Sequence, residues 1–139
     1  MKSQRTISVL FIVAALYDGL LGAAFLFASG RLFEWYKVTP PNHPGYVQFP
    51  ALVLLIFALM FLAVAWDPGS NRNLIPYGIL LKAAYAGVVL YYWLTIDLPD
   101  MWKPFCIGDL TFLVLFAWAW VALGGRAGEP RATDEWVEG

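Results

Sequence analysis

The chain has 139 residues, of which 60% are hydrophobic and only 14% charged, and its mean hydropathy is +0.64. A soluble domain carries roughly 25% charged and about 45–50% apolar residues, so this composition excludes an ordinary soluble globular protein. The net charge of −1, with no basic cluster in the sequence, argues against nucleic acid as a partner.

The apolar residues fall into four blocks, each close to the ~20 residues that a helix needs to cross the hydrocarbon core of a bilayer. The blocks cover residues 7–29, 47–66, 74–96 and 105–123. The first block continues through Phe27, beyond the point where the apolar part of a cleaved signal peptide ends, which favours a transmembrane helix. The sequence therefore predicts an all-α integral membrane protein with one domain, residues 1–123.

The segments between the blocks predict how the helices connect. The longest, 30–46, mixes aromatic and charged residues in its first half, which predicts a position on the membrane surface. Its second half is rich in proline and is predicted to be extended. The other two connections are short, which predicts antiparallel neighbours in sequence order and an up-down-up-down four-helix bundle. The polar tail, 124–139, is predicted to be disordered.

Lysine and arginine outside the blocks predict the orientation. Five lie on the side of both termini and three lie on the opposite side. The first group is Lys2, Arg5, Arg72, Arg126 and Arg131, and the second is Arg31, Lys37 and Lys103. Because cytoplasmic segments carry the excess of positive charge, this distribution predicts that both termini are cytoplasmic.

Three ionisable residues lie within the apolar blocks: Asp18, Lys82 and Asp109. Asp18 and Lys82 lie roughly 16 and 12 Å from the same end of the predicted bundle, at 1.5 Å per residue. Small residues lie one turn to either side of each, and small residues let helices approach closely in lipid. We therefore expect Asp18 to pair with Lys82. Asp109 is only about 6 Å inside the opposite rim, where water or Lys103 would solvate it.

The function of this pair has two interpretations. It either fixes the register of two helices, or it forms a proton or anion site or the polar floor of a lipid-facing cavity. Four tyrosines are candidates for lining such a cavity: Tyr17, Tyr85, Tyr91 and Tyr92. His43, in the proline-rich connection, is expected to act as a hydrogen-bonding residue rather than as a catalyst. One histidine and one cysteine cannot build a zinc, haem or iron–sulfur site, so no metal or cofactor is predicted.

The stretches "PPNHPGYVQFPALVLL", "NRNLIPYGILLK" and "MWKPF" resemble those of a group of small uncharacterised bacterial four-helix membrane proteins. This resemblance implies a multi-pass protein of the bacterial inner membrane and implies no activity. In its hydropathy the chain is also similar to the DoxX-like family, some members of which are linked to quinone-dependent oxidoreductases. That similarity implies the four-helix architecture only.

The sequence shows no nucleophile–base pair, metal cluster or phosphate-binding loop. This favours a non-enzymatic accessory subunit of a membrane complex, or a subunit that binds a lipid-like ligand. Its partners would be membrane lipids and another membrane protein or a second copy of the chain. One alternative is an enzyme or redox subunit acting on a quinone or another lipid-soluble substrate, with Asp18, Lys82 and Asp109 handling protons. Another is a small oligomeric transporter.

Overall fold

The computed structural model describes residues 2–125, and within them the chain is helical apart from its connections. The helices are α1 (Lys2–Trp35), α2 (Gly45–Trp66), α3 (Ile75–Thr95) and α4 (Lys103–Gly124), with a short 3-10 helix, η1 (Arg72–Leu74), before α3. All four long helices are apolar and long enough to span a membrane. The predicted all-α four-helix fold is therefore confirmed, whereas most of the predicted tail lies outside the described residues.

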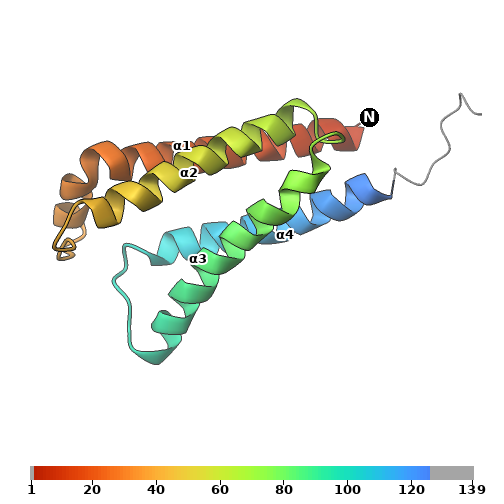
Figure 1. Ribbon diagram of the computed structural model, residues 1–139. Coiled ribbons are helices and arrows are strands. Elements are labelled where there is room, and N and C mark those ends of the chain that lie inside the picture. The colour runs from red at the N-terminus through yellow and green to blue at the C-terminus, as the bar shows by residue number, and fades with distance from the viewer. Residues whose placement is uncertain (1, 126–139) are drawn as a thin grey trace, which may run out of the picture.

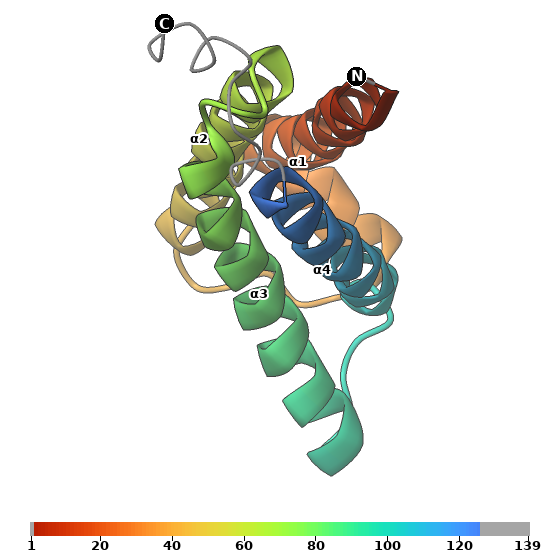
Figure 2. The same cartoon turned by 90° about the vertical axis from the view of Figure 1, so that its right-hand side faces the viewer.

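The helices pack as two antiparallel hairpins, α1 with α2 and α3 with α4 (Figure 1). We call the end of the bundle where α1 begins and α4 ends the terminal end, and the opposite end the loop end. α2 and α3 are consecutive, but they contact each other only over a short stretch and then diverge toward the loop end (Figures 1 and 2). The expectation that α2 and α3 would be close neighbours is therefore correct only near their connection.

Small residues explain why α1 lies so close to α2. A Cβ at Gly22 would lie 2.8 Å from the backbone oxygen of Ala51, and one at Gly19 would lie 3.6 Å from the Cβ of Ala58. In lipid no hydrophobic force draws helices together, so close backbone approach and van der Waals contact carry the association. The glycines of α1 therefore select α2 as its closest neighbour.

α1 is longer than the predicted 7–29, because it continues through a kink to Trp35. At the kink Ala28 has a non-helical backbone, with φ −132° and ψ 24°. The following turn brings Phe33 back onto the loop end of the bundle, where it is 5% exposed and packs against Phe25 and Trp102. The first half of the predicted 30–46 connection is thus helical, and the real connection is shorter.

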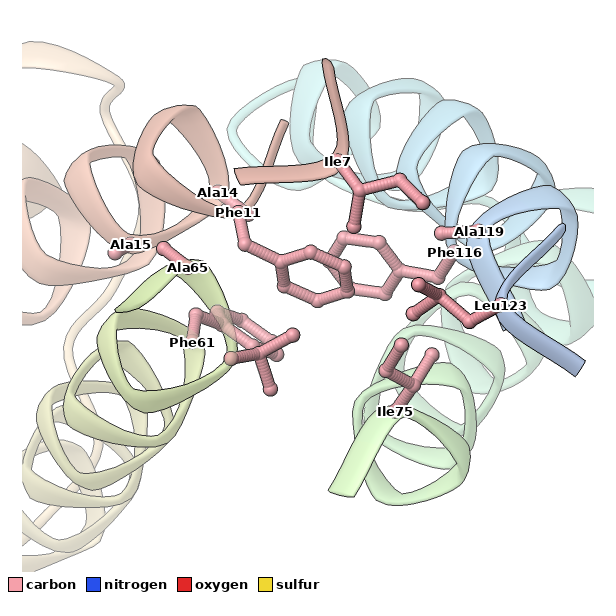
Figure 3. Packing of buried hydrophobic residues seen from close by; sticks show 11 residues of the cluster. Ile7, Phe11, Ala14, Ala15, Phe61, Ala65, Ile75, Phe116, Ala119 and Leu123 are labelled. Atoms are coloured by element: carbon pink, nitrogen blue, oxygen red, sulfur yellow. The ribbon is translucent and has the colours of Figure 1, made fainter. Parts of the chain in front are cut away.

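An apolar cluster from all four helices closes the terminal end (Figure 3). Phe11 and Phe116 stack with ring centroids 4.6 Å apart, and Phe61 tilts against Phe116 at 5.1 Å. All three rings are fully buried. Aromatic pairs of this kind contribute about 0.5–1.5 kcal/mol beyond the area that they bury. The cluster therefore joins the two hairpins firmly at the terminal end.

Candidate functional site

Three charged side chains meet inside the bundle, each from a different helix. The Nζ of Lys82 on α3 lies 2.7 Å from Oδ1 of Asp18 on α1 and 3.0 Å from Oδ1 of Asp109 on α4. Asp18 and Lys82 are each 1% exposed, and Asp109 is 7% exposed. The contact that the sequence predicts between Asp18 and Lys82 is present, and Asp109 completes a carboxylate–ammonium–carboxylate cluster. We call these three residues the charge cluster.

The position of Asp109 corrects an expectation from the sequence. Lys103 is not its partner, because the Nζ of Lys103 lies 2.6 Å from Oδ1 of Asp100 instead. α4 begins at Lys103, so Asp109 is deeper than a count from residue 105 implies. α3 also packs along α4, which places Lys82 within reach of Asp109. Depth along one helix could not reveal this contact, since it depends on how two helices cross.

The local sequence explains how a lysine is accommodated here. Gly78, one turn before Lys82, leaves room for the ring of Phe61, which belongs to the apolar cluster at the terminal end. A Cβ at Gly78 would lie 2.8 Å from Cε1 of Phe61. The ammonium of Lys82 lies 5.3 Å from the ring centroids of both Tyr17 and Phe112. Aromatic faces within about 6 Å attract a cation. The lysine therefore has aromatic neighbours in addition to its two carboxylate partners.

A cavity of about 390 Å³ adjoins the charge cluster on its loop-end side. Its wall is mostly apolar and aromatic, and includes Phe25, Trp102 and Phe105. Among the described residues that line it are both carboxylates of the cluster, Asp18 and Asp109, but not Lys82. The cavity therefore has apolar walls and an acidic floor.

Asp18 leaves one acceptor unused at this floor. Its Oδ1 accepts the hydrogen bond from Lys82, but Oδ2 is buried without a hydrogen-bond partner among the described residues. A buried polar group without a partner costs free energy, about 1–3 kcal/mol, and a charged one costs more. An unsatisfied carboxylate oxygen beside a cavity indicates a place for a hydrogen-bond donor.

Of the four candidate tyrosines, only Tyr85 lines the cavity. Tyr85 lines the cavity and donates a hydrogen bond to the backbone oxygen of Trp102, at 3.3 Å. Tyr17 packs beside Lys82 and against Phe112, and does not line the cavity. Tyr91 and Tyr92 pack against each other near the end of α3, away from the cavity lining.

His43 belongs to the turn that precedes α2 and not to the charge cluster. Its Nδ1 accepts a hydrogen bond from the backbone N–H of Gly45, at 3.0 Å, and its side chain is exposed. The next aromatic residue, Tyr46, does line the cavity. Within residues 2–125, no group of three or more His, Cys, Asp and Glu side chains is placed to hold a metal ion.

Sequence reasoning missed the aromatic wall of the cavity. Trp102 lies next to a predicted helix start, a position typical of an interfacial tryptophan, and nothing in the sequence marks Phe25 or Phe105 as part of a site. In the structure Phe25 and Trp102 stack with ring centroids 5.9 Å apart. The only available signal was the concentration of aromatic residues at the loop-end boundaries of two blocks.

Comparisons with models of protein families, with curated proteins and with solved structures find no match for this chain. The fold and the site therefore define a class and not a family. The chain is a small multi-pass membrane protein built from four apolar helices in two antiparallel hairpins. Within the described residues it contains a buried charge cluster beneath an aromatic cavity.

Proposed function

We propose that this protein binds a lipid-like ligand in the cavity and works as a non-enzymatic accessory subunit of a membrane complex. The observation that carries the proposal is the cavity of about 390 Å³, whose walls are apolar and whose floor holds Asp18 and Asp109. Ligand pockets of roughly 300–1,000 Å³ typically combine apolar walls with a few polar groups that orient the ligand. An amphiphile would place its apolar body against the walls and its polar head at the carboxylates.

The arrangement of the helices supports entry from the lipid. Tyr46 and Phe49 line the cavity and are also 69% and 71% exposed, so the cavity reaches the outer surface along α2. α2 and α3 contact each other only over a short stretch and diverge toward the loop end (Figure 2). The apolar cluster of Figure 3 closes the terminal end. A lipid-soluble molecule would therefore enter laterally between α2 and α3, on the loop-end side of the charge cluster.

The proposal includes the kind of membrane and the orientation of the chain in it. With five basic residues on the side of the termini against three opposite, we place both termini in the cytoplasm of a bacterial cell and the protein in the inner membrane. The cavity would then open to the outer leaflet of that membrane. Another membrane protein or a second copy would contact the large lipid-facing surface, on which Phe27 and Leu94 are more than 80% exposed.

A second candidate function is a redox subunit or enzyme acting on a quinone. The observation that favours it is that both carboxylates line the cavity and share one ammonium group. Reduction of a quinone takes up electrons as well as protons. A partner redox subunit would supply the electrons, and the carboxyl groups beside the ring would relay the protons. The similarity in hydropathy to DoxX-like proteins is compatible with this function and stays a prediction.

Co-purified small molecules test the proposal. The full-length protein would be purified in lipid nanodiscs, and the bound molecules identified by native mass spectrometry. In a Val53→Trp variant the indole would fill the cavity, because Val53 lines it, and we expect the bound molecule to be lost. Ile56→Trp is the matched control, since Ile56 is on the same helix and is 63% exposed to lipid. It should retain the ligand.

The identity of the bound molecule decides between the two candidates. A quinone that is lost in Val53→Trp and retained in Ile56→Trp would favour the redox function. Equal amounts of bound lipid in the wild-type protein and both variants would contradict a ligand site in this cavity.

A further inference from the structure

The charge on the cavity floor restricts the ligands that the proposed site accepts. Two carboxylates, Asp18 and Asp109, line the cavity, whereas their shared cation, Lys82, does not. With all three groups ionised, the charge cluster carries one negative charge more than positive. A negatively charged head group would enter a low-dielectric site next to carboxylates and would be repelled. The floor therefore disfavours fatty acids and other anionic amphiphiles.

The unused acceptor points to a ligand with a hydrogen-bond donor. Oδ2 of Asp18 is buried and has no hydrogen-bond partner among residues 2–125. The whole residue is 1% exposed, so bulk water does not reach it. Asp18 lines the cavity, so a donor on a ligand there would reach the buried Oδ2 once the carboxylate turns toward the cavity. Hydrogen bonds to an ionised acceptor are about twice as strong as neutral ones.

The aromatic wall provides a third and independent argument. The ring of Phe25 stacks on that of Trp102 with centroids 5.9 Å apart and meets that of Phe105 edge to face at 6.5 Å. All three residues line the cavity together with Tyr85. The face of an aromatic ring attracts a cation, most strongly when water is excluded. Walls of this kind suit an organic cation as well as an apolar chain.

We propose that the ligand is a lipophilic amine in its protonated form, with an N–H group donating to Oδ2 of Asp18. Asp109 offsets the remaining positive charge, and the aromatic wall surrounds the apolar part next to the nitrogen. This inference rests on the proposed ligand-binding function and names its chemical class. The ammonium group belongs either to a free alkylamine or to the head group of an aminophospholipid.

Three probes with the same chain test the inference: dodecylamine, dodecanol and dodecanesulfonate. Each would be titrated at pH 7 against the full-length protein in phosphatidylcholine nanodiscs, with occupancy read by native mass spectrometry. We expect the amine to bind more than about tenfold more tightly than the alcohol, because it forms a charge-assisted hydrogen bond. The sulfonate should bind least. This comparison needs no variant, so it is independent of folding defects.

A matched pair of variants locates the preference. Asp109→Asn keeps the side-chain size and removes one negative charge, so it should weaken binding of the amine more than that of the alcohol. Asp67→Asn removes a carboxylate from the exposed connection after α2 and should change neither. Nanodiscs that also contain phosphatidylethanolamine separate the two sources. If phosphatidylethanolamine competes with dodecylamine, the ammonium group belongs to the lipid head group. If it does not compete, the ligand is a free amine.

Two kinds of result would overturn the inference. If dodecanol binds as tightly as dodecylamine and Val53→Trp abolishes both, the cavity is a ligand site but does not select a cation. Tighter binding of the sulfonate would have the same meaning. If none of the three probes binds, or if Val53→Trp changes no binding, the proposed function fails together with the inference.

Discussion

Replacing Lys82 with methionine would remove the cation between two buried carboxylates while keeping a long, unbranched side chain in its place. The change eliminates two charge-assisted hydrogen bonds, of 2.7 and 3.0 Å, each worth about 1.5–3 kcal/mol. It also leaves Asp18 and Asp109 facing each other without a counter-charge. Breaking a buried ion pair by removing one partner typically costs about 3–5 kcal/mol. We expect the free energy of unfolding of Lys82→Met to fall by about that amount.

The loss should be partly reversed when the carboxylates are neutralised. Asp18→Asn alone lowers stability, because it removes an ionised acceptor from Lys82. In the Asp18→Asn/Lys82→Met double variant one unpaired charge is gone, so the combined loss should be smaller than the sum of the single losses. Adding Asp109→Asn removes the remaining buried charge and should restore more. Coupling between residues in contact is about 0.5–3 kcal/mol, which is large enough to measure.

Reversible unfolding in mixed detergent micelles, followed by far-ultraviolet circular dichroism, measures these differences. Leu80→Met is the matched control, because Leu80 is on the same helix and is 63% exposed to lipid. It should stay within about 0.5 kcal/mol of the wild-type protein. If the single losses from Asp18→Asn and Lys82→Met add within about 0.5 kcal/mol, the two residues are not coupled and the reasoning is refuted.

Two further predictions concern orientation and helix packing. Alkaline phosphatase fused after Gly139 should be inactive and a fluorescent reporter at the same place active, because the excess of basic residues retains the termini in the cytoplasm; an active phosphatase would reverse the orientation. Gly22→Ala should lower the free energy of unfolding by about 1–3 kcal/mol, because its Cβ would lie 2.8 Å from the backbone oxygen of Ala51. Gly87→Ala, with nothing within 4 Å of its Cβ, should be neutral or stabilising by up to about 1 kcal/mol, and an equal loss in both variants would contradict the packing argument.

The sequence alone was sufficient for the membrane fold and for one contact of the charge cluster. Helix number follows from the thickness of the bilayer, which requires ~20 apolar residues for each crossing. The pairing of Asp18 with Lys82 was predictable because both are deep charges at similar depth, each between small residues on one helix face. Such charges in lipid need partners, and few partners exist.

Only the tertiary structure shows that Asp109 belongs to the charge cluster and that a cavity lies beside it. Asp109 reaches Lys82 because of where α4 begins and how it packs against α3, and neither can be read from depth along a single helix. The cavity exists because Gly22 and its neighbours hold α2 against α1, while α3 diverges from α2 along α4. Periodicity and composition specify which residues suit a helix in lipid. The crossing of two helices depends on contacts between side chains far apart in the chain, and those contacts place the carboxylates beneath aromatic walls.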